Sequence, residues 1–287
     1  LIQAGLHADE CPPLLVASQL VEQLTELETQ RALNCQIRVI TQANPIDGSQ
    51  WLRGHHVGRI DLSSGRNFNR DMPRLAEQTL SEVKRRLTDN PVTNRAMARS
   101  IWQEALSGVT VESPVDALQV VLQSRAVEAD WVFDLHSDDE GEVHLYAFPQ
   151  HQALAEALGI RLGASTVLTA EQSGADSFDD ALVGFWAVLD REFPGAGFDN
   201  PVVAMTCELR GTRDVSKALA EHDASALIDF LATQGLIQRT VAAVEGSVAT
   251  KPLAGMDPIT SPDSGLLVWH AALGDEFEAG GLVAELY

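Results

Sequence analysis

Residues 131 to 136 read Trp-Val-Phe-Asp-Leu-His, an apolar run that turns polar within three residues. Valine and aromatic residues favour strands, and a run without polar alternation is typical of a strand buried inside a sheet. Asp134 and His136 stand where this strand ends. Ligands of open α/β sheets gather beyond the carboxyl ends of the strands, because the loops converge at that rim. The stretch therefore predicts a buried strand that delivers polar side chains to a functional rim.

Two other strand-like runs end in polar groups in the same way. Residues 1–4 lead to His7 and Glu10, and residues 202–207 end at Glu208. His7 and Glu10 are three residues apart at a strand-to-helix turn, so both can face one ion. Together with His136 they form a set of two histidines and one carboxylate. This is a known catalytic zinc set with an open fourth position. Each motif taken alone has a structural alternative, such as a hydrogen-bonded core histidine.

Short β-rich runs alternate with long helical stretches over the first 243 residues, which predicts an α/β fold. A second strand is expected at 37–41, followed by a Pro/Gly/Asn-rich loop. The expected helices are at 13–27, within 72–125 with breaks near Asn90-Pro91 and at 108–114, and at 150–158, 176–193 and 216–236. The chain opens on a strand that runs straight into a polar motif, so upstream strands are expected in the natural protein.

The composition changes from about residue 244, where Gly, Pro, Ser and Thr become frequent and the helical period disappears. Residues 265–269 and 281–286 are expected to form short strands. We therefore divide the chain into a catalytic domain, 1–243, and a small all-β domain, 244–287. Residues 274–280 resemble a turn of the biotinyl/lipoyl carrier barrel, but Lys251 is far from the acceptor position, so a structural or substrate-gating role is expected.

Acidic residues outnumber basic ones by 41 to 20 and give a net charge of -21. Nucleic acids and anionic membranes both attract Lys and Arg, so neither is an expected partner. Three cysteines leave an odd count, which favours a reducing compartment over a disulfide framework. With no visible secretory signal and no apolar run of roughly 20 residues, the expected location is the cytoplasm.

Five short motifs occur in the order typical of one enzyme family. They resemble motifs of the succinylglutamate desuccinylase/aspartoacylase family, within the zinc carboxypeptidase superfamily: Gly5-Leu6-His7-Ala8-Asp9-Glu10, Asn44-Pro45, Gly65-Arg66-Asn67-Phe68-Asn69-Arg70, Asp134-Leu135-His136 and Cys207-Glu208-Leu209-Arg210-Gly211. The resemblance spans nearly the whole chain. It implies a zinc-carboxypeptidase-like mixed β-sheet flanked by helices, with a biotinyl/lipoyl-like barrel as the C-terminal domain.

The resemblance also implies a role for each polar group of these motifs. The metal ligands for one Zn²⁺ per chain would be His7, Glu10 and His136. Glu208 would be the general base, and Asp134 would orient a ligand histidine through its ring N–H. Asn69 and Arg70 would bind a substrate carboxylate, which a planar guanidinium can hold with two hydrogen bonds.

An arginine upstream of Asn69 is expected to polarise the scissile carbonyl. Arg59 is our choice and Arg53 and Arg66 are its rivals, since the loop spacing departs from the family pattern. The family's Asp-Leu before Asn-Arg is Asn67-Phe68 here, and its following Phe-Pro-Gly is 71–73, Asp-Met-Pro. Both departures lie where the substrate is chosen.

The expected function is zinc-dependent hydrolysis of the amide of an N-acyl amino acid or a similar small amide carrying a carboxylate. One alternative is a zinc carboxypeptidase acting on peptides, and another is a silent metal-retaining binding protein. Glu208 argues against the silent protein, because a binder has little use for the base. The acidic loop 137–142 either attracts a cationic amine or is a solvated turn. The acyl group and assembly into a homo-oligomer stay open.

Overall fold

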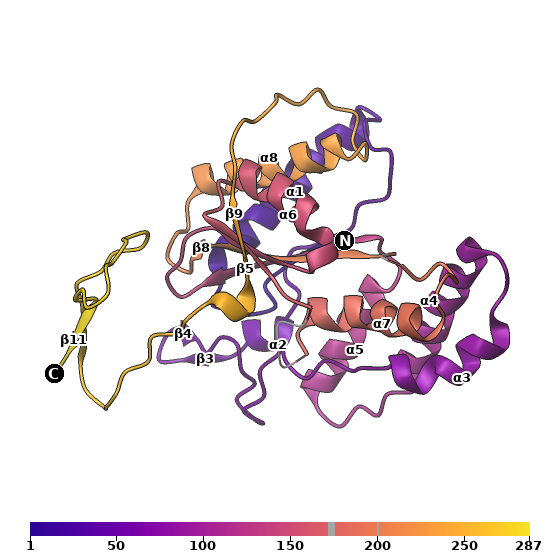
Figure 1. Cartoon of the computed structure of the whole chain (residues 1–287), viewed down its shortest axis with the longest axis horizontal. Coiled ribbons are helices and arrows are strands. Elements are labelled where there is room, and N and C mark those ends of the chain that lie inside the picture. The colour runs from indigo at the N-terminus through magenta and orange to yellow at the C-terminus, as the bar shows by residue number, and fades with distance from the viewer. Residues whose placement is uncertain (172–175, 200) are drawn as a thin grey trace.

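A seven-stranded mixed sheet forms the centre of the computed structural model, which describes residues 1–171, 176–199 and 201–287 (Figure 1). The strands lie in the order β2-β1-β5-β8-β6-β7-β9. Neighbours from β2 to β8 are parallel, β6 is antiparallel to β8, and β7 and β9 continue parallel to β6. The bounds are β1 Ile2–Ala4, β2 Val39–Ile40, β5 Trp131–Asp138, β6 His144–Ala147, β7 Thr166–Thr169, β8 Val203–Gly211 and β9 Ala249–Pro252.

Helices cover both faces of this sheet (Figure 1). One face carries α1 (Cys11–Thr29), α6 (Gln152–Leu162) and α8 (Lys217–Thr233). The other carries α3 (Ala76–Arg86), α4 (Pro91–Ser107), α5 (Pro114–Ala126) and α7 (Phe178–Glu192). A short helix, α2 (Pro45–Gly48), and two 3₁₀ turns, η1 (Pro149–His151) and η2 (Leu253–Gly255), complete the helical elements. The expected α/β class, a mixed sheet flanked by helices, is confirmed.

The expected breaks in the helical region 72–125 separate α3, α4 and α5, and the reasons are local. Asn90 accepts a hydrogen bond from the Thr93 N–H and so caps α4. Ser113 forms a capping box with Asp116 at the start of α5. In both cases a proline follows at the first helical position, where its missing N–H is harmless.

Side-chain alternation along the two central strands decides which face holds the polar groups. On β5, Phe133 and Leu135 belong to the core beneath α1 and α8. Asp134 and His136 therefore point to the opposite face, the α7 face. The same alternation on β8 buries Cys207 in the α8 core and turns Glu208 to the α7 face. The polar ends of both strands thus share one side of the sheet.

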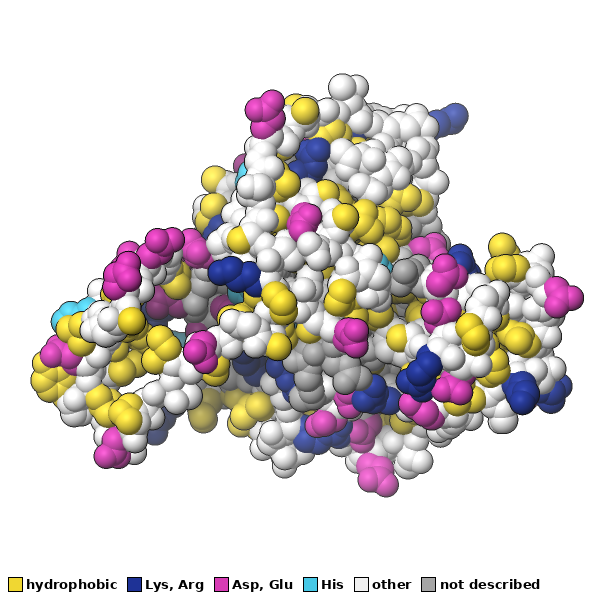
Figure 2. All heavy atoms as spheres, in the orientation of Figure 1, with side chains coloured by type: hydrophobic (Ala, Val, Ile, Leu, Met, Phe, Trp, Pro, Cys, Tyr) yellow, Lys and Arg dark blue, Asp and Glu magenta, His cyan; other side chains and the backbone are white. Residues whose placement is uncertain are grey.

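The C-terminal segment divides between the main sheet and a separate hairpin. β9 pairs with β7, so residues 249–252 belong to the main sheet. Beyond them, β10 (Leu267–Trp269) and β11 (Ala284–Leu286) pair antiparallel, which agrees with the two expected short strands. In Figure 1 the hairpin projects to one side of the main body, although its loop at Gly274 approaches Glu142, and Figure 2 shows hydrophobic side chains gathered on it. The barrel and the boundary after residue 243 stay predictions.

A second hairpin, β3 (Trp51–Leu52) and β4 (His55–His56), lies in the loop between α2 and α3. Among the described residues, none of the helices is both long and apolar enough to cross a membrane.

Candidate active site

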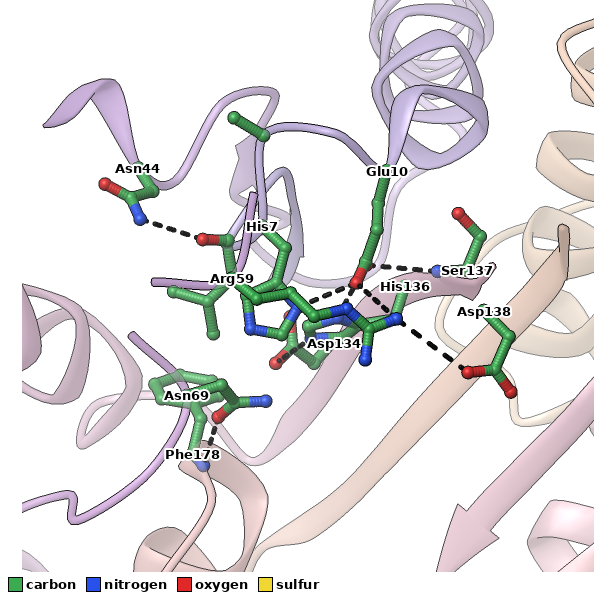
Figure 3. A network of polar contacts seen from close by, with 12 residues as sticks. His7, Glu10, Asn44, Arg59, Asn69, Asp134, His136, Ser137, Asp138 and Phe178 are labelled. Atoms are coloured by element: carbon green, nitrogen blue, oxygen red, sulfur yellow. Dashed lines mark hydrogen bonds and ion pairs between the residues drawn. The ribbon is translucent and has the colours of Figure 1, made fainter. Parts of the chain in front are cut away.

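His7, Glu10 and His136 converge in a buried cluster at the carboxyl ends of β1 and β5 (Figure 3). The Nδ1 atom of His7 lies 2.7 Å from Glu10 Oε1, and the Nδ1 atom of His136 lies 2.8 Å from Glu10 Oε2. One ligand atom from each residue falls within 4.8 Å of the others. The structure thus brings together the three residues predicted as metal ligands.

The turn that carries His7 and Glu10 is held by the next loop. Gly5 has a φ of +73°, which a side chain would strain, and it lets the chain leave β1 sharply. Asn44 donates a hydrogen bond from Nδ2 to the Leu6 carbonyl at 2.9 Å. Asp47 accepts one from the Ala8 N–H at 2.7 Å. The segment around α2 therefore fixes the backbone on which the two residues stand.

Each histidine of the cluster has an acceptor behind its ring. His136 Nε2 lies 3.0 Å from Asp134 Oδ2, an ion-pair contact whose angle departs from that of a hydrogen bond. Asp134 is itself fixed, since Oδ1 accepts a hydrogen bond from Gln3 Nε2 at 3.0 Å. His7 Nε2 lies 3.2 Å from Asn67 Oδ1.

These contacts give a test of whether the cluster suits a metal ion. Both nitrogens of both rings face acceptor oxygens, so the cluster has a surplus of acceptors in a buried place. A divalent cation held by the two Nδ1 atoms and Glu10 would match that surplus, with the Nε2–H of His7 donating to Asn67 and the Nε2–H of His136 facing the Asp134 carboxylate. An oriented Nε2–H is the usual arrangement behind a metal-bound histidine. The residues present fit a metal such as zinc.

The charges of the cluster shift the pKa of its members. Burial alone lowers the pKa of His136, but the carboxylates of Asp134 and Glu10 outweigh it and raise that pKa well above 6.5. Burial would raise the pKa of Glu10, yet His136 and His7 lower it well below its usual range. Glu10 is therefore an ionised carboxylate, the form in which it can bind a cation.

Glu208 stands beside His136 as its partner in the β5–β8 register, on the same face of the sheet. Its Oε2 atom is buried and has no hydrogen-bond partner within the described part of the chain. Burial raises the pKa of Glu208 to about 8, with Glu10 and Asp138 acting in the same direction and His136 and Arg59 against it. A carboxyl group with a pKa near neutrality can both accept and return a proton.

Arg59 is the arginine that reaches the cluster. Its Nη2 atom lies 3.6 Å from Glu10 Oε1 and 3.8 Å from Asp138 Oδ1 (Figure 3). Of its rivals, Arg66 is engaged with Asp116 on α5. Arg53 is exposed in the turn between β3 and β4.

Asn69 and Arg70 lie at the edge of the cluster, next to the start of α7. Asn69 Oδ1 accepts a hydrogen bond from the Phe178 N–H at 2.8 Å, which fixes the amide and leaves Nδ2 as a donor (Figure 3). Arg70 is exposed and donates to the Asn69 carbonyl at 2.7 Å. Both thus present donors that a carboxylate can accept.

Two residues join this site without having been assigned a role from the sequence, Gln3 behind Asp134 and Asp47 beneath the turn that carries His7 and Glu10. Asn67, expected where the substrate is chosen, lies behind His7, and Tyr146 lies on β6, the strand next to the one that carries Glu208. Burial, with help from Glu208 and Asp138, raises the pKa of Tyr146 to about 12, so its hydroxyl stays a hydrogen-bond donor. The Asp-Leu-His and Asn-Arg motifs give no signal for these contacts, which arise between distant segments.

Comparison with known proteins places this site in a family. Residues 1–233 match the succinylglutamate desuccinylase/aspartoacylase catalytic domain. None of the curated proteins compared with the chain matches it.

Solved structures share the fold. A succinylglutamate desuccinylase/aspartoacylase family protein from Shewanella amazonensis superimposes with a TM-score of 0.82 at 23% identity, over 99% of this chain and 78% of its own. A second, from Shewanella frigidimarina, gives 0.82 at 24% identity, over 99% and 76%. The product-bound ectoine utilization protein EutE (DoeB) from Ruegeria pomeroyi gives 0.65 at 14% identity, over 100% and 72%.

The matched segment covers most of the chain and contains every polar group of the cluster, from His7 to Glu208. The chain therefore belongs to the succinylglutamate desuccinylase/aspartoacylase family.

Proposed function

We propose that the chain is a zinc-dependent hydrolase that cleaves the amide bond of an N-acyl amino acid. The observation that carries the proposal is the buried His7–Glu10–His136 cluster with Glu208 in register beside it. Two histidines and a carboxylate leave one position for water or substrate, as catalytic zinc sites do. One ion per chain would occupy the cluster and supply a Lewis acid that makes water a nucleophile near neutral pH.

Glu208 is the proposed general base and acid. Its partly buried carboxyl group faces the cluster from β8, and its Oε2 atom has no hydrogen-bond partner among the described residues. The carboxylate would take a proton from the attacking water and return it to the nitrogen of the leaving amine. Both transfers need only one carboxyl group that can change its protonation state, which its raised pKa supports.

Arg59, Asn69 and Arg70 are the proposed substrate contacts. Arg59 is 38% exposed at the side chain while its guanidinium lies near Glu10, so it can face a carbonyl oxygen and the negative charge that develops there. The Nδ2 donor of Asn69 and the exposed guanidinium of Arg70 would bind the carboxylate of the amino acid.

A carboxypeptidase acting on peptides is the second candidate. The exposure of Arg70 favours it, because a carboxylate held there leaves room for a longer acyl part. The N-acyl amino acid hydrolase and the carboxypeptidase would use the same cluster and the same base, so only trials with both kinds of substrate separate them.

The test is turnover of acetylated and succinylated amino acids, beside short peptides, by the purified, zinc-supplied protein. We expect amino acid release that falls by about 100-fold or more in Glu208→Gln, with zinc content unchanged. Glu221→Gln, an exposed change on α8, is the matched control and should leave turnover intact. Full turnover in Glu208→Gln would reject the role of this residue, and release from peptides alone would favour the carboxypeptidase.

A further inference from the structure

β8 contains a bulge directly after Glu208. His136 pairs with Glu208, but Asp138 pairs with Gly211, so two residues of β8 lie opposite one residue of β5. The extra residue is Arg210, which has a φ of +70°. This left-handed conformation is usual for glycine and strained for arginine, so the surrounding structure has to hold it. Bulges of this kind redirect side chains and occur often beside active sites.

The bulge changes the face to which Arg210 points. Regular alternation after Glu208 would place Arg210 on the same face as that carboxylate, the α7 face. Its guanidinium instead reaches Asp223 on α8, which packs on the opposite face with Cys207. A basic side chain is thereby removed from the side of the sheet that carries the proposed base.

The contact that holds Arg210 is a two-pronged ion pair. Nη1 donates to Asp223 Oδ2 at 2.7 Å and Nη2 donates to Asp223 Oδ1 at 3.0 Å. The side chain of Asp223 is 1% exposed and that of Arg210 is 19% exposed. A fork-to-fork pair fixes direction as well as distance, and the low exposure protects it from screening.

The end of the bulge also supports the acidic loop. The Gly211 N–H donates to Asp214 Oδ2 at 3.0 Å, and the Thr212 N–H donates to the Asp138 carbonyl at 2.8 Å. A Cβ on Gly211 would come within 3.1 Å of the Asp139 carbonyl oxygen, so the loop packs tightly on this glycine. The backbone from Glu208 to Thr212 is therefore one connected unit with the loop that faces Arg59.

We propose that the Arg210–Asp223 pair is a positioning clamp that holds the bulge and so aims Glu208 at the metal cluster. Two observations support it: the strained backbone of Arg210, and the direction of its side chain away from Glu208. Without the clamp, β8 can relax to regular alternation, which shifts Glu208 and turns residue 210 to the same face as its carboxylate. The inference rests on the proposed function only in its kinetic consequence, since the clamp itself is a feature of the fold.

The test compares Arg210→Ala, which removes the pair and leaves a side chain that disfavours the left-handed backbone, with Asp223→Asn, which keeps the shape and weakens the pair. In the zinc-supplied protein we expect kcat to fall by about 10- to 100-fold in both, with KM changed by less than about 3-fold. Asp229→Asn is the control, because Asp229 lies on the same helix, α8, and forms a single, more exposed ion pair with Arg239, and it should keep the kcat of the parent.

A double variant separates positioning from stability. Asp223→Asn alone leaves a half-buried cation without its partner, so its thermal midpoint should drop. Adding Arg210→Ala removes that cation, and the midpoint should recover in part while kcat stays low. If kcat recovers together with the midpoint, or if Asp229→Asn lowers kcat as much, the proposal is wrong.

Amide hydrogen exchange gives a readout that needs no turnover. Exchange at the amides of 208–212 should become faster in Arg210→Ala and Asp223→Asn and stay unchanged in Asp229→Asn. Unchanged exchange in the two clamp variants overturns the proposal. A parent protein that hydrolyses no acyl amino acid would defeat the proposed function, while the exchange result would still support or refute the clamp.

Discussion

At the scale of single residues, the two histidines of the cluster are arranged alike. Each presents Nδ1 to Glu10 and keeps Nε2 for an acceptor behind the ring, Asp134 for His136 and Asn67 for His7. The acceptors differ in charge, because one is a carboxylate and the other an amide. We expect His136 to be the more firmly held ligand, since its acceptor is anionic and is itself fixed by Gln3.

The raised pKa of Glu208 predicts a pH-dependent stability of the zinc-free protein. Its pKa in the folded chain, about 8, lies above its ordinary value of 4.5. The folded state therefore binds this proton more tightly, and its contribution to stability is present below pH 4.5 and lost as the pH rises through 8. Between pH 5 and 8 the loss should be roughly 1 to 3 kcal/mol, since each pKa unit corresponds to about 1.4 kcal/mol.

Urea unfolding of the chelator-treated protein at pH 5 and pH 8 measures this loss. Glu208→Gln cannot titrate, so its free energy of unfolding should fall less between the two pH values than that of the parent. Equal losses in both proteins would show that Glu208 is ionised throughout and that burial does not control its charge.

The sequence indicates which residues come together in the His7–Glu10–His136 cluster but not which residues lie behind them, for a physical reason. His7 and Glu10 are three residues apart, and His136 lies near the end of the buried strand β5, so local spacing already restricts where they point. Gln3 and Asn67 reach the site only through tertiary pairing, across 131 and 60 residues of chain. Single-sequence patterns do not contain that information.

At the scale of elements, the short segment around α2 supports the turn that carries His7 and Glu10. Asn44 contributes two hydrogen bonds to this support. Its Oδ1 accepts one from the Asp47 N–H at 3.0 Å, and its Nδ2 donates one to the Leu6 carbonyl at 2.9 Å. The side chain is fully buried, so both partners lose a hydrogen bond if it is removed.

Asn44→Ala should lower the free energy of unfolding by about 2 to 4 kcal/mol and weaken zinc binding by about 10-fold or more. Asn90→Ala removes a comparable helix cap at the start of α4, far from the cluster, and should cost about 1 kcal/mol without changing zinc affinity. Denaturant unfolding and chelator competition measure the two effects. Equal zinc affinity in both variants would show that α2 does not support the site.

Element prediction succeeded where periodicity is strong. The long helices and the buried strands β5 and β8 have clear apolar patterns, and prolines mark the helix starts at Pro91 and Pro114. β6 and β7 were not predicted, because each has four residues and is stabilised by its neighbours in the sheet. The bulge after Glu208 was equally unpredictable, since its residue is an arginine and not the glycine that usually marks such a position.

At the scale of the whole molecule, the C-terminal segment has two kinds of contact. β9 extends the main sheet beside β7, and Thr250 donates to Glu156 on α6 at 2.7 Å. The hairpin β10–β11 instead keeps much of its apolar surface open, with Trp269 59% exposed. A two-stranded sheet alone contributes little stability.

Ending the chain after Pro252 should therefore shift the thermal midpoint by less than about 3 °C, whereas ending it after Ala243, which also removes β9, should lower it by about 5 °C or more. Circular dichroism on heating measures both. A large drop already in the chain that ends after Pro252 would mean that the hairpin stabilises the fold, and would favour a compact C-terminal domain that begins near 244.

The cluster of two histidines and a glutamate is the centre of this account, and metal content tests it most directly. Elemental analysis of the purified, zinc-supplied protein should find about one zinc per chain, and His136→Ala should lose it, because only two ligands remain. His222→Ala, an exposed histidine on α8, is the control and should retain the metal. If neither the parent nor the control holds zinc, the cluster is structural only and the hydrolase proposal is wrong.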